Sequence, residues 1–159
     1  MLAIGVIGSG CCDFQAYRAA EEVGRLLAEA GAVVVCGGLG GVMEAACRGA
    51  KLAGGRTLGI LPGTDAAQAN PYVDIPIVTG MGEARNQILA RTSRALIAVG
   101  GEYGTLSEIA FALKFGRPVV GLRTWQLARG GMPVQAIAEA ETPQEAVRLA
   151  LELARERGA

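Results

Sequence analysis

The sequence of 159 residues contains no histidine and only two lysines, Lys51 and Lys114. Without an imidazole, the chain cannot form a Ser-His or Cys-His nucleophile pair or use histidine as a general base. Its four cysteines include no C-x-x-C pair, so their spacing does not favour zinc either. We therefore expect no metal, and the available chemistry rests on carboxylates, arginines, hydroxyls, thiols and backbone N–H groups.

A net charge is also lacking, because 15 basic residues balance 15 acidic ones. Proteins that bind nucleic acid through a basic field carry a positive excess, so this balance argues against such a partner. No apolar run reaches the roughly 20 residues that span a bilayer. The apolar start of the chain lacks the basic residues of a signal peptide. We expect a cytoplasmic protein with neither a membrane nor a nucleic-acid partner.

Hydrophobic residues make up 51% of the chain, and they alternate between two patterns. Short continuous apolar runs predict strands, and segments with helical periodicity lie between them. This alternation predicts an α/β fold, a Rossmann-like, doubly wound and mainly parallel sheet with helices on both faces. Residues 1–159 would form a single nucleotide-binding domain of this type. The strand runs are 2–7, 32–36, 57–61, 75–78, 95–99, 118–122 and a less regular one near 134–137; the helical segments are 16–30, 42–53, 83–92, 105–115 and one that starts at 142–143.

Glycine is abundant, with 24 residues, and its clusters follow the predicted strands at 8–10, 37–41 and 100–104. In doubly wound sheets, ligands bind beyond the carboxyl ends of the strands, where the strand order reverses. Glycines at that edge let the backbone approach a ligand closely and aim N–H groups at an anion. The clusters therefore predict a binding site at this edge.

The stretch VGGEYGTLSE, residues 99–108, allows two interpretations. Glycines between a strand and a helix are typical of a phosphate loop, in which Gly101, Gly104 and Thr105 would hold the phosphate at the helix N-terminus. Alternatively, Thr105 and Glu108 form a T-x-x-E capping box. The same pattern recurs without glycines at Thr142–Glu145, where capping alone explains it, so capping does not account for the glycines of the first stretch.

Arg85 follows a glycine pair at the start of a predicted helix. A cation is disfavoured by the helix dipole at that position, so the arginine invites an anionic partner. The alternative is an exposed arginine on a solvated helix face.

Together, GSG at 8–10, CGGLGGVM at 36–43, Arg85 and VGGEYGTLSE at 99–108 resemble the Lonely Guy (LOG) family, formerly mislabelled lysine decarboxylases. The resemblance implies a Rossmann-like homodimer or higher homo-oligomer that hydrolyses the N-glycosidic bond of nucleoside 5′-monophosphates, without pyridoxal phosphate. It assigns catalysis to Arg85 and Glu108. The residues that it assigns to the phosphorylated nucleotide-like ligand are Gly8, Ser9, Gly10, Gly37, Gly38, Gly40, Gly41, Met43, Gly100, Gly101, Gly104 and Thr105.

The sequence departs from the LOG pattern at Asn86, where the family has lysine, at Gly100, where it has proline, and at Glu102, where it has glycine. A carboxylate within a phosphate loop repels a dianion unless it points to solvent. A sister branch of the superfamily, which includes molybdenum-cofactor carrier proteins, resembles these motifs more closely. The alternative function is therefore a non-catalytic carrier or sensor of a nucleotide or molybdopterin-type ligand.

Overall fold

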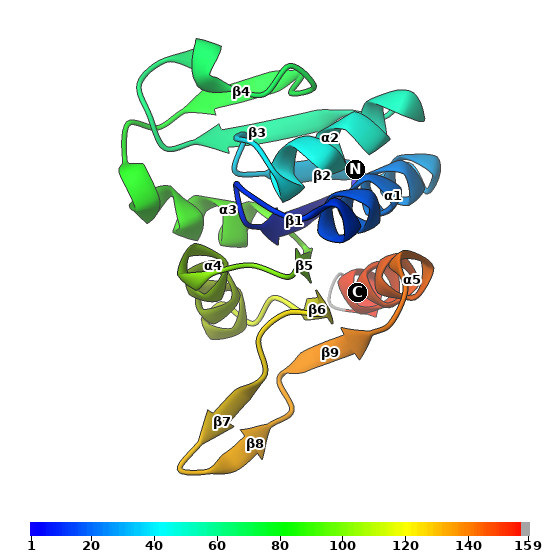
Figure 1. Cartoon of the computed structure of the whole chain (residues 1–159), viewed down its shortest axis with the longest axis vertical. Helices are drawn as coiled ribbons and strands as arrows, with labels where there is room; N and C mark the ends of the chain where they lie inside the picture. The colour runs from blue at the N-terminus through cyan, green and yellow to red at the C-terminus, as the bar shows by residue number, and fades with distance from the viewer. Residues whose placement is uncertain (157–159) are drawn as a thin grey trace.

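The computed structural model describes residues 1–156, which form a seven-stranded sheet in the order β4-β3-β2-β1-β5-β6-β9 (Figure 1). All neighbouring strands in this sheet are parallel. The strands are β1 (Ala3–Gly8), β2 (Val33–Cys36), β3 (Thr57–Leu61), β4 (Ile75–Val78), β5 (Ala95–Val99), β6 (Val119–Leu122) and β9 (Ile137–Ala140).

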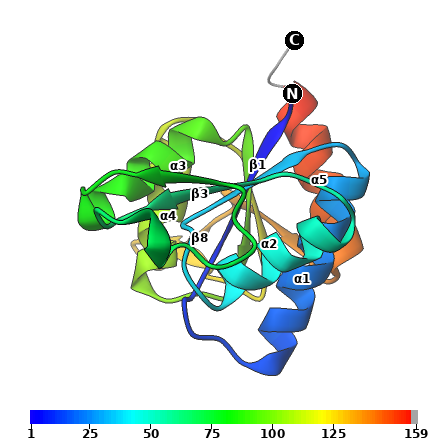
Figure 2. The same cartoon turned by 90° about the horizontal axis from the view of Figure 1, so that it is seen from above.

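Five α-helices cover the two faces of the sheet: α1 (Phe14–Glu29), α2 (Val42–Leu52), α3 (Asn86–Thr92), α4 (Tyr103–Lys114) and α5 (Pro143–Glu156). Helices α1, α2 and α5 lie on one face and α3 and α4 on the other (Figure 2). Each face has its own apolar core, with Val6, Val34 and Ile97 on the first side and Ile7, Val35 and Leu96 on the second. Because both faces are covered, the strands are apolar on both sides, as parallel sheets require.

The strand order reverses between β1 and β5, and the register there aligns the carboxyl ends of neighbouring strands. Gly8 of β1 lies beside Val99 of β5, Val99 beside Leu122 of β6, and Leu122 beside Ala140 of β9. The loops that follow these strands therefore start from one common edge. This is the edge at which a doubly wound sheet binds its ligand.

The predicted fold class is confirmed, and several strand boundaries agree closely with the prediction. The structure differs at 83–92, where a 3₁₀ turn, η2 (Gly82–Arg85), precedes a short α3. It also differs at 105–115, because α4 begins at Tyr103, two residues earlier than predicted. The prediction placed Gly104 in the loop before the helix, but glycine is tolerated in a first turn, which lacks a complete set of helical hydrogen bonds.

The strand predicted near 134–137 is also corrected, since Val134 ends one strand and Ile137 begins another. A ribbon of β7 (Leu127–Arg129) and β8 (Met132–Val134) precedes β9 and projects from the body of the molecule (Figure 1). Gly130 and Gly131, with φ of 55° and 79°, form its turn. A glycine pair of this kind is a hairpin signal that the prediction overlooked.

A further short turn, η1 (Ala66–Gln68), interrupts the predicted loop between β3 and β4. Within residues 1–156, no helix combines the length and apolar character needed to cross a membrane.

Candidate functional site

The N-termini of the longer helices fall into two groups. Helix α1 is capped by Asp13, whose Oδ1 accepts the Ala16 N–H at 2.8 Å. Helix α5 is capped by Thr142, whose hydroxyl accepts the Glu145 N–H at 3.2 Å, while the Glu145 carboxylate accepts the Glu141 N–H at 2.9 Å. Helices α2 and α4 have no side-chain cap. In α2, however, the Val42 N–H donates to the Ser9 carbonyl at 3.0 Å, whereas within the described chain the first three N–H groups of α4 have no partner and are available to an anion.

The loop before α4 explains why its N-terminus stays open. Gly100 and Gly101 have φ of 55° and 103°, the left-handed region that favours glycine. A Cβ on Gly101 would lie 2.4 Å from the Thr105 Oγ1, so the glycine lets Thr105 pack beneath the loop. Thr105 is consequently buried as the third residue of the helix rather than at the cap position. Within the described chain, its hydroxyl has no hydrogen-bond partner, and neither it nor Glu108 caps the helix.

A cavity of about 390 Å³ lies in front of this helix N-terminus, on the β1–β2–β3 side of the point where the strand order reverses. The loop after β1, the start of α2, the end of β3, η2 and the first turns of α4 all contribute to it. The lining residues are Gly8, Ser9, Gly10, Leu39, Met43, Pro62, Glu83, Arg85, Asn86, Glu102, Gly104, Thr105 and Glu108.

Arg85 forms the inner wall of the cavity and is only 7% exposed. Its Nη1 lies 3.6 Å from the Glu108 Oε1, and its Nη2 donates to the Gly37 carbonyl at 3.4 Å. The Nε is buried and has no hydrogen-bond partner among the described residues. A buried donor without an acceptor is costly, so this nitrogen is open to a water or a ligand atom.

Glu108 is 6% exposed and lines the same cavity opposite Arg85. Burial raises the pKa of its carboxyl group from 4.5 to about 7, while the Arg85 guanidinium opposes part of that increase. A carboxyl group with this pKa exchanges a proton near neutral pH, which suits a general acid or base. The cavity thus holds both a permanent cation and a group that titrates at neutral pH.

Asn86 connects Arg85 to the first turns of α4. Its Oδ1 accepts a hydrogen bond from the Arg85 Nη1, and its Nδ2 donates to the Ser107 Oγ at 2.9 Å. Ser107 in turn donates to the Gly104 carbonyl at 2.6 Å. This chain of side chains fixes the arginine relative to the open helix N-terminus.

The cavity brings together many of the residues that the sequence predicted for the site. Arg85 and Glu108, the predicted catalytic pair, face each other across it. The alternative of an exposed Arg85 is wrong, because the side chain is buried by the Gly37 loop and α4. The other predicted residues that line it are Gly8, Ser9, Gly10, Met43, Gly104 and Thr105.

The remaining predicted glycines do not line this cavity. Most of them allow close packing around it, whereas Gly100 has no atom within 4 Å of a Cβ. A Cβ on Gly37 would lie 2.6 Å from the Arg85 Nη2, and one on Gly41 would lie 2.2 Å from the Ser9 carbonyl oxygen. A Cβ on Gly38 would meet Leu61 at 2.6 Å, so this glycine packs against the neighbouring strand. The glycines concerned are Gly37, Gly38, Gly40, Gly41, Gly100 and Gly101.

Five lining residues were not predicted as site residues: Leu39, Pro62 and Glu83, together with Asn86 and Glu102, which the sequence marked only as departures from the LOG pattern. Pro62 directly follows β3, so the strand-end rule that identified the glycine clusters also applies to it. Leu39 stands within the second glycine cluster, where its apolar side chain signals a contact surface rather than a tight turn. Glu83 carries no comparable signal, because η2 reaches the site only through the fold.

Residues 1–151 match the model of the SLOG cluster4 family. The chain belongs to the SLOG cluster4 family. This finding confirms the expected relationship to the LOG and molybdenum-cofactor-carrier superfamily. A protein from Archaeoglobus fulgidus is 49% identical over 147 residues, which cover 92% of this chain and 93% of that protein.

Solved structures extend the SLOG cluster4 comparison. The molybdenum cofactor binding protein from Rippkaea orientalis is 35% identical, with a TM-score of 0.85 and 96% of each chain covered. A Moco carrier protein from Chlamydomonas reinhardtii is 39% identical, with a TM-score of 0.84 and 98% of each chain covered. The similarity therefore extends over nearly the whole of all three chains.

Proposed function

We propose that the protein binds a phosphorylated nucleotide-like or pterin-type ligand in the cavity, with the phosphate at the N-terminus of α4. The observation that carries this proposal is the open helix N-terminus, where Gly104 and Thr105 line the cavity and the threonine hydroxyl has no partner in the described chain. Partial positive charge and free N–H groups at such a terminus attract phosphate.

The rest of the cavity fits a ligand of this class. Leu39, Met43 and Pro62 supply an apolar surface for a planar ring. Arg85 and Glu108 line the same cavity, where they would meet the sugar or the linking group. A mostly apolar cavity with a few convergent polar groups is the usual form of a small-molecule site.

Within this class, we infer that the protein is a carrier that holds its ligand without turnover. The inference is supported by the full-length similarity to solved proteins that bind or carry the molybdenum cofactor. A molybdopterin-type compound would then be the cargo.

The second candidate function is hydrolysis of the N-glycosidic bond of a nucleoside 5′-monophosphate, and the geometry of Glu108 favours it. In this reaction, water adds to C1′ of the ribose as the bond to the base breaks. The Glu108 carboxylate would orient the water and accept its proton, and it would stabilise the positive charge that develops on the sugar. Arg85 would stabilise the negative charge that develops on the departing base, which finally takes up a proton. The products are the free base and ribose 5-phosphate.

One experiment separates these functions. The protein is incubated with AMP, GMP and other monophosphates; bound ligand is measured by equilibrium dialysis and free base by chromatography. Binding without base release supports the carrier. Base release that disappears in Glu108→Gln but persists in the matched variant Glu145→Gln supports the hydrolase. If no phosphorylated compound binds, including a pterin phosphate, the proposal is wrong.

A further inference from the structure

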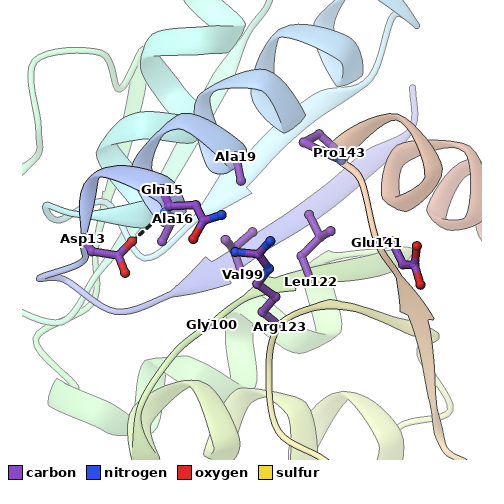
Figure 3. A pocket seen from close by; sticks show the side chains of 10 residues that line it. All are labelled: Asp13, Gln15, Ala16, Ala19, Val99, Gly100, Leu122, Arg123, Glu141 and Pro143. Atoms are coloured by element: carbon purple, nitrogen blue, oxygen red, sulfur yellow. Dashed lines mark hydrogen bonds between the residues drawn. The ribbon is translucent and has the colours of Figure 1, made fainter.

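A second cavity, of about 270 Å³, lies on the other side of the point where the strand order reverses (Figure 3). The ends of β5 and β6, the first turn of α1 and the start of α5 surround it. Its lining residues are Asp13, Gln15, Ala16, Ala19, Val99, Gly100, Leu122, Arg123, Glu141 and Pro143. The proposed function does not use this cavity.

Arg123 is the unusual residue of the second cavity. It directly follows β6, and its side chain points into the cavity toward the first turn of α1 (Figure 3). With φ of 51°, it is the one non-glycine residue in the left-handed region among residues 1–156. Such a conformation is strained for arginine, and strained residues concentrate at ligand-binding positions.

Arg123 is exposed at the mouth of the second cavity, and its guanidinium pairs with neither of the two carboxylates that line it. Across the described chain, it makes no hydrogen bond or ion pair with Asp13, Glu141 or any other residue. Asp13 uses one oxygen to cap α1. The five N–H donors of Arg123 are therefore free to bind an acceptor edge of a ligand.

The remaining lining suits a planar heterocycle. Val99, Leu122 and Pro143 are apolar and offer a surface to the face of a ring. Gln15 can donate and accept, and Glu141 can only accept, so donor and acceptor groups of a ring edge both find partners.

The two cavities flank the same two loops. Gly104 lines the first cavity and Gly100 the second, so the open N-terminus of α4 lies between them. On the loop after β1, Gly10 lines the first cavity and Asp13 the second. One cavity is on the β1–β2–β3 side of the reversal point and the other on the β5–β6–β9 side. In doubly wound folds, dinucleotides bind across this crevice with the pyrophosphate at a helix N-terminus.

We propose that the ligand belongs to the dinucleotide class, with two ring systems joined by a pyrophosphate, and that the second cavity binds the second ring through Arg123. The proposal rests on the proposed function, because the phosphate at α4 is common to both. It specifies the class of ligand that would fill both cavities.

The test compares ligands that add one part at a time. AMP, ADP, ADP-ribose, NAD⁺ and diadenosine pyrophosphate are titrated by calorimetry into the wild-type protein, Arg123→Ala and the control Arg129→Ala. Arg129 is an exposed arginine of the β7–β8 ribbon and lines neither cavity. We expect at least one compound with two ring systems to bind about tenfold or more tightly than ADP. Arg123→Ala should abolish that gain and leave AMP and ADP affinity unchanged, while Arg129→Ala should leave all affinities unchanged.

A second variant separates binding from folding. Arg123→Gly removes the side chain and relieves the left-handed strain, so its melting temperature should equal or exceed that of the wild type. It should nevertheless lose the gain from the second ring. If AMP binds but no compound with two rings binds more tightly than ADP, the dinucleotide proposal is wrong and the proposed function stands. The same conclusion follows if the Arg123 variants weaken all ligands equally or none. If no phosphorylated compound binds, the proposed function itself fails.

Discussion

Two T-x-x-E segments of this chain, Thr105–Glu108 and Thr142–Glu145, have the same sequence pattern and different roles. Thr142 and Glu145 cap α5 by accepting the N–H groups of Glu145 and Glu141. Thr105 and Glu108 lie inside α4, where both side chains face a cavity. The difference comes from what precedes the threonine. A glycine loop starts α4 two residues earlier, which moves the pattern past the cap position and leaves the helix N-terminus open.

The largest expected effect is a loss of base release when Glu108, but not Glu145, is replaced by glutamine. If the protein hydrolyses nucleotides, Glu108→Gln should lower the rate of base release by at least about a hundredfold, because the amide can neither accept a proton nor carry charge. Glu145→Gln should leave the rate unchanged, since that side chain caps α5 and lines neither cavity. The rate of base release from AMP, followed by chromatography, checks this. Equal rates in Glu108→Gln and the wild type would contradict a catalytic role for Glu108.

A pH dependence of stability should distinguish the same two glutamates. Burial raises the pKa of Glu108 from 4.5 to about 7, so between these values the folded protein holds a proton that the unfolded chain releases. Stability should therefore fall as the pH rises from 4.5 to 7, by about 3 kcal/mol, and then level off. Glu22 and Asp74 have lowered pKa values and titrate below this window.

Urea unfolding at a series of pH values measures this effect. The Glu108→Gln protein should show a flat profile between pH 4.5 and 7, whereas Glu145→Gln should retain the wild-type slope. A wild-type stability that rises with pH through this window would show that burial does not control the Glu108 carboxyl group.

The glycine loop can be tested by adding a single methyl group. Gly101→Ala forces a Cβ against the Thr105 side chain at a φ of 103° and should destabilise the protein by about 2 kcal/mol. Gly54, with φ of 73° and no atom within 4 Å of a Cβ, provides the control. Gly54→Ala bears only the backbone strain and should cost about 1 kcal/mol. Denaturant unfolding compares them, and equal losses would mean that the loop does not pack on Thr105.

The smallest expected effect is the loss of the α5 cap. Thr142→Ala should lower the free energy of unfolding by about 1 kcal/mol, because the Glu145 N–H loses its acceptor. Ligand affinity should not change, since Thr142 lines neither cavity. A reduced affinity for AMP in this variant would contradict the division of roles between the two segments.

Much of this architecture was predictable, because apolar runs and glycine clusters report strands and their carboxyl ends. Strand β5 and its glycine loop, for example, lie where the sequence places them. The start of α4 was not predictable from the cap pattern, since Thr105 satisfies the rule but is displaced by packing against Gly101. The role of Gly37 was also hidden, because its closeness to Arg85 depends on the fold.

Of the residues that line the second cavity, only Gly100 was predicted as a ligand residue. Arg123 directly follows β6, and its left-handed backbone arises from the turn after that strand, which has no distinct sequence pattern. The properties of Glu108 were predictable only in part. The motif identified the residue, but its raised pKa depends on burial by elements distant in sequence. Sequence patterns therefore located the edge of the sheet at which both cavities lie, whereas tertiary packing determines which side chains line them.

The most direct measurement compares Thr105→Val with Thr142→Ala, using AMP affinity by calorimetry and the free energy of unfolding. Valine keeps the shape of the buried threonine and removes only its hydroxyl. The expected result is that Thr105→Val weakens AMP binding by about tenfold and changes stability by less than about 0.5 kcal/mol, while Thr142→Ala does the reverse. If Thr105→Val binds AMP as tightly as the wild type, the open end of α4 is not the phosphate site, and the account is wrong.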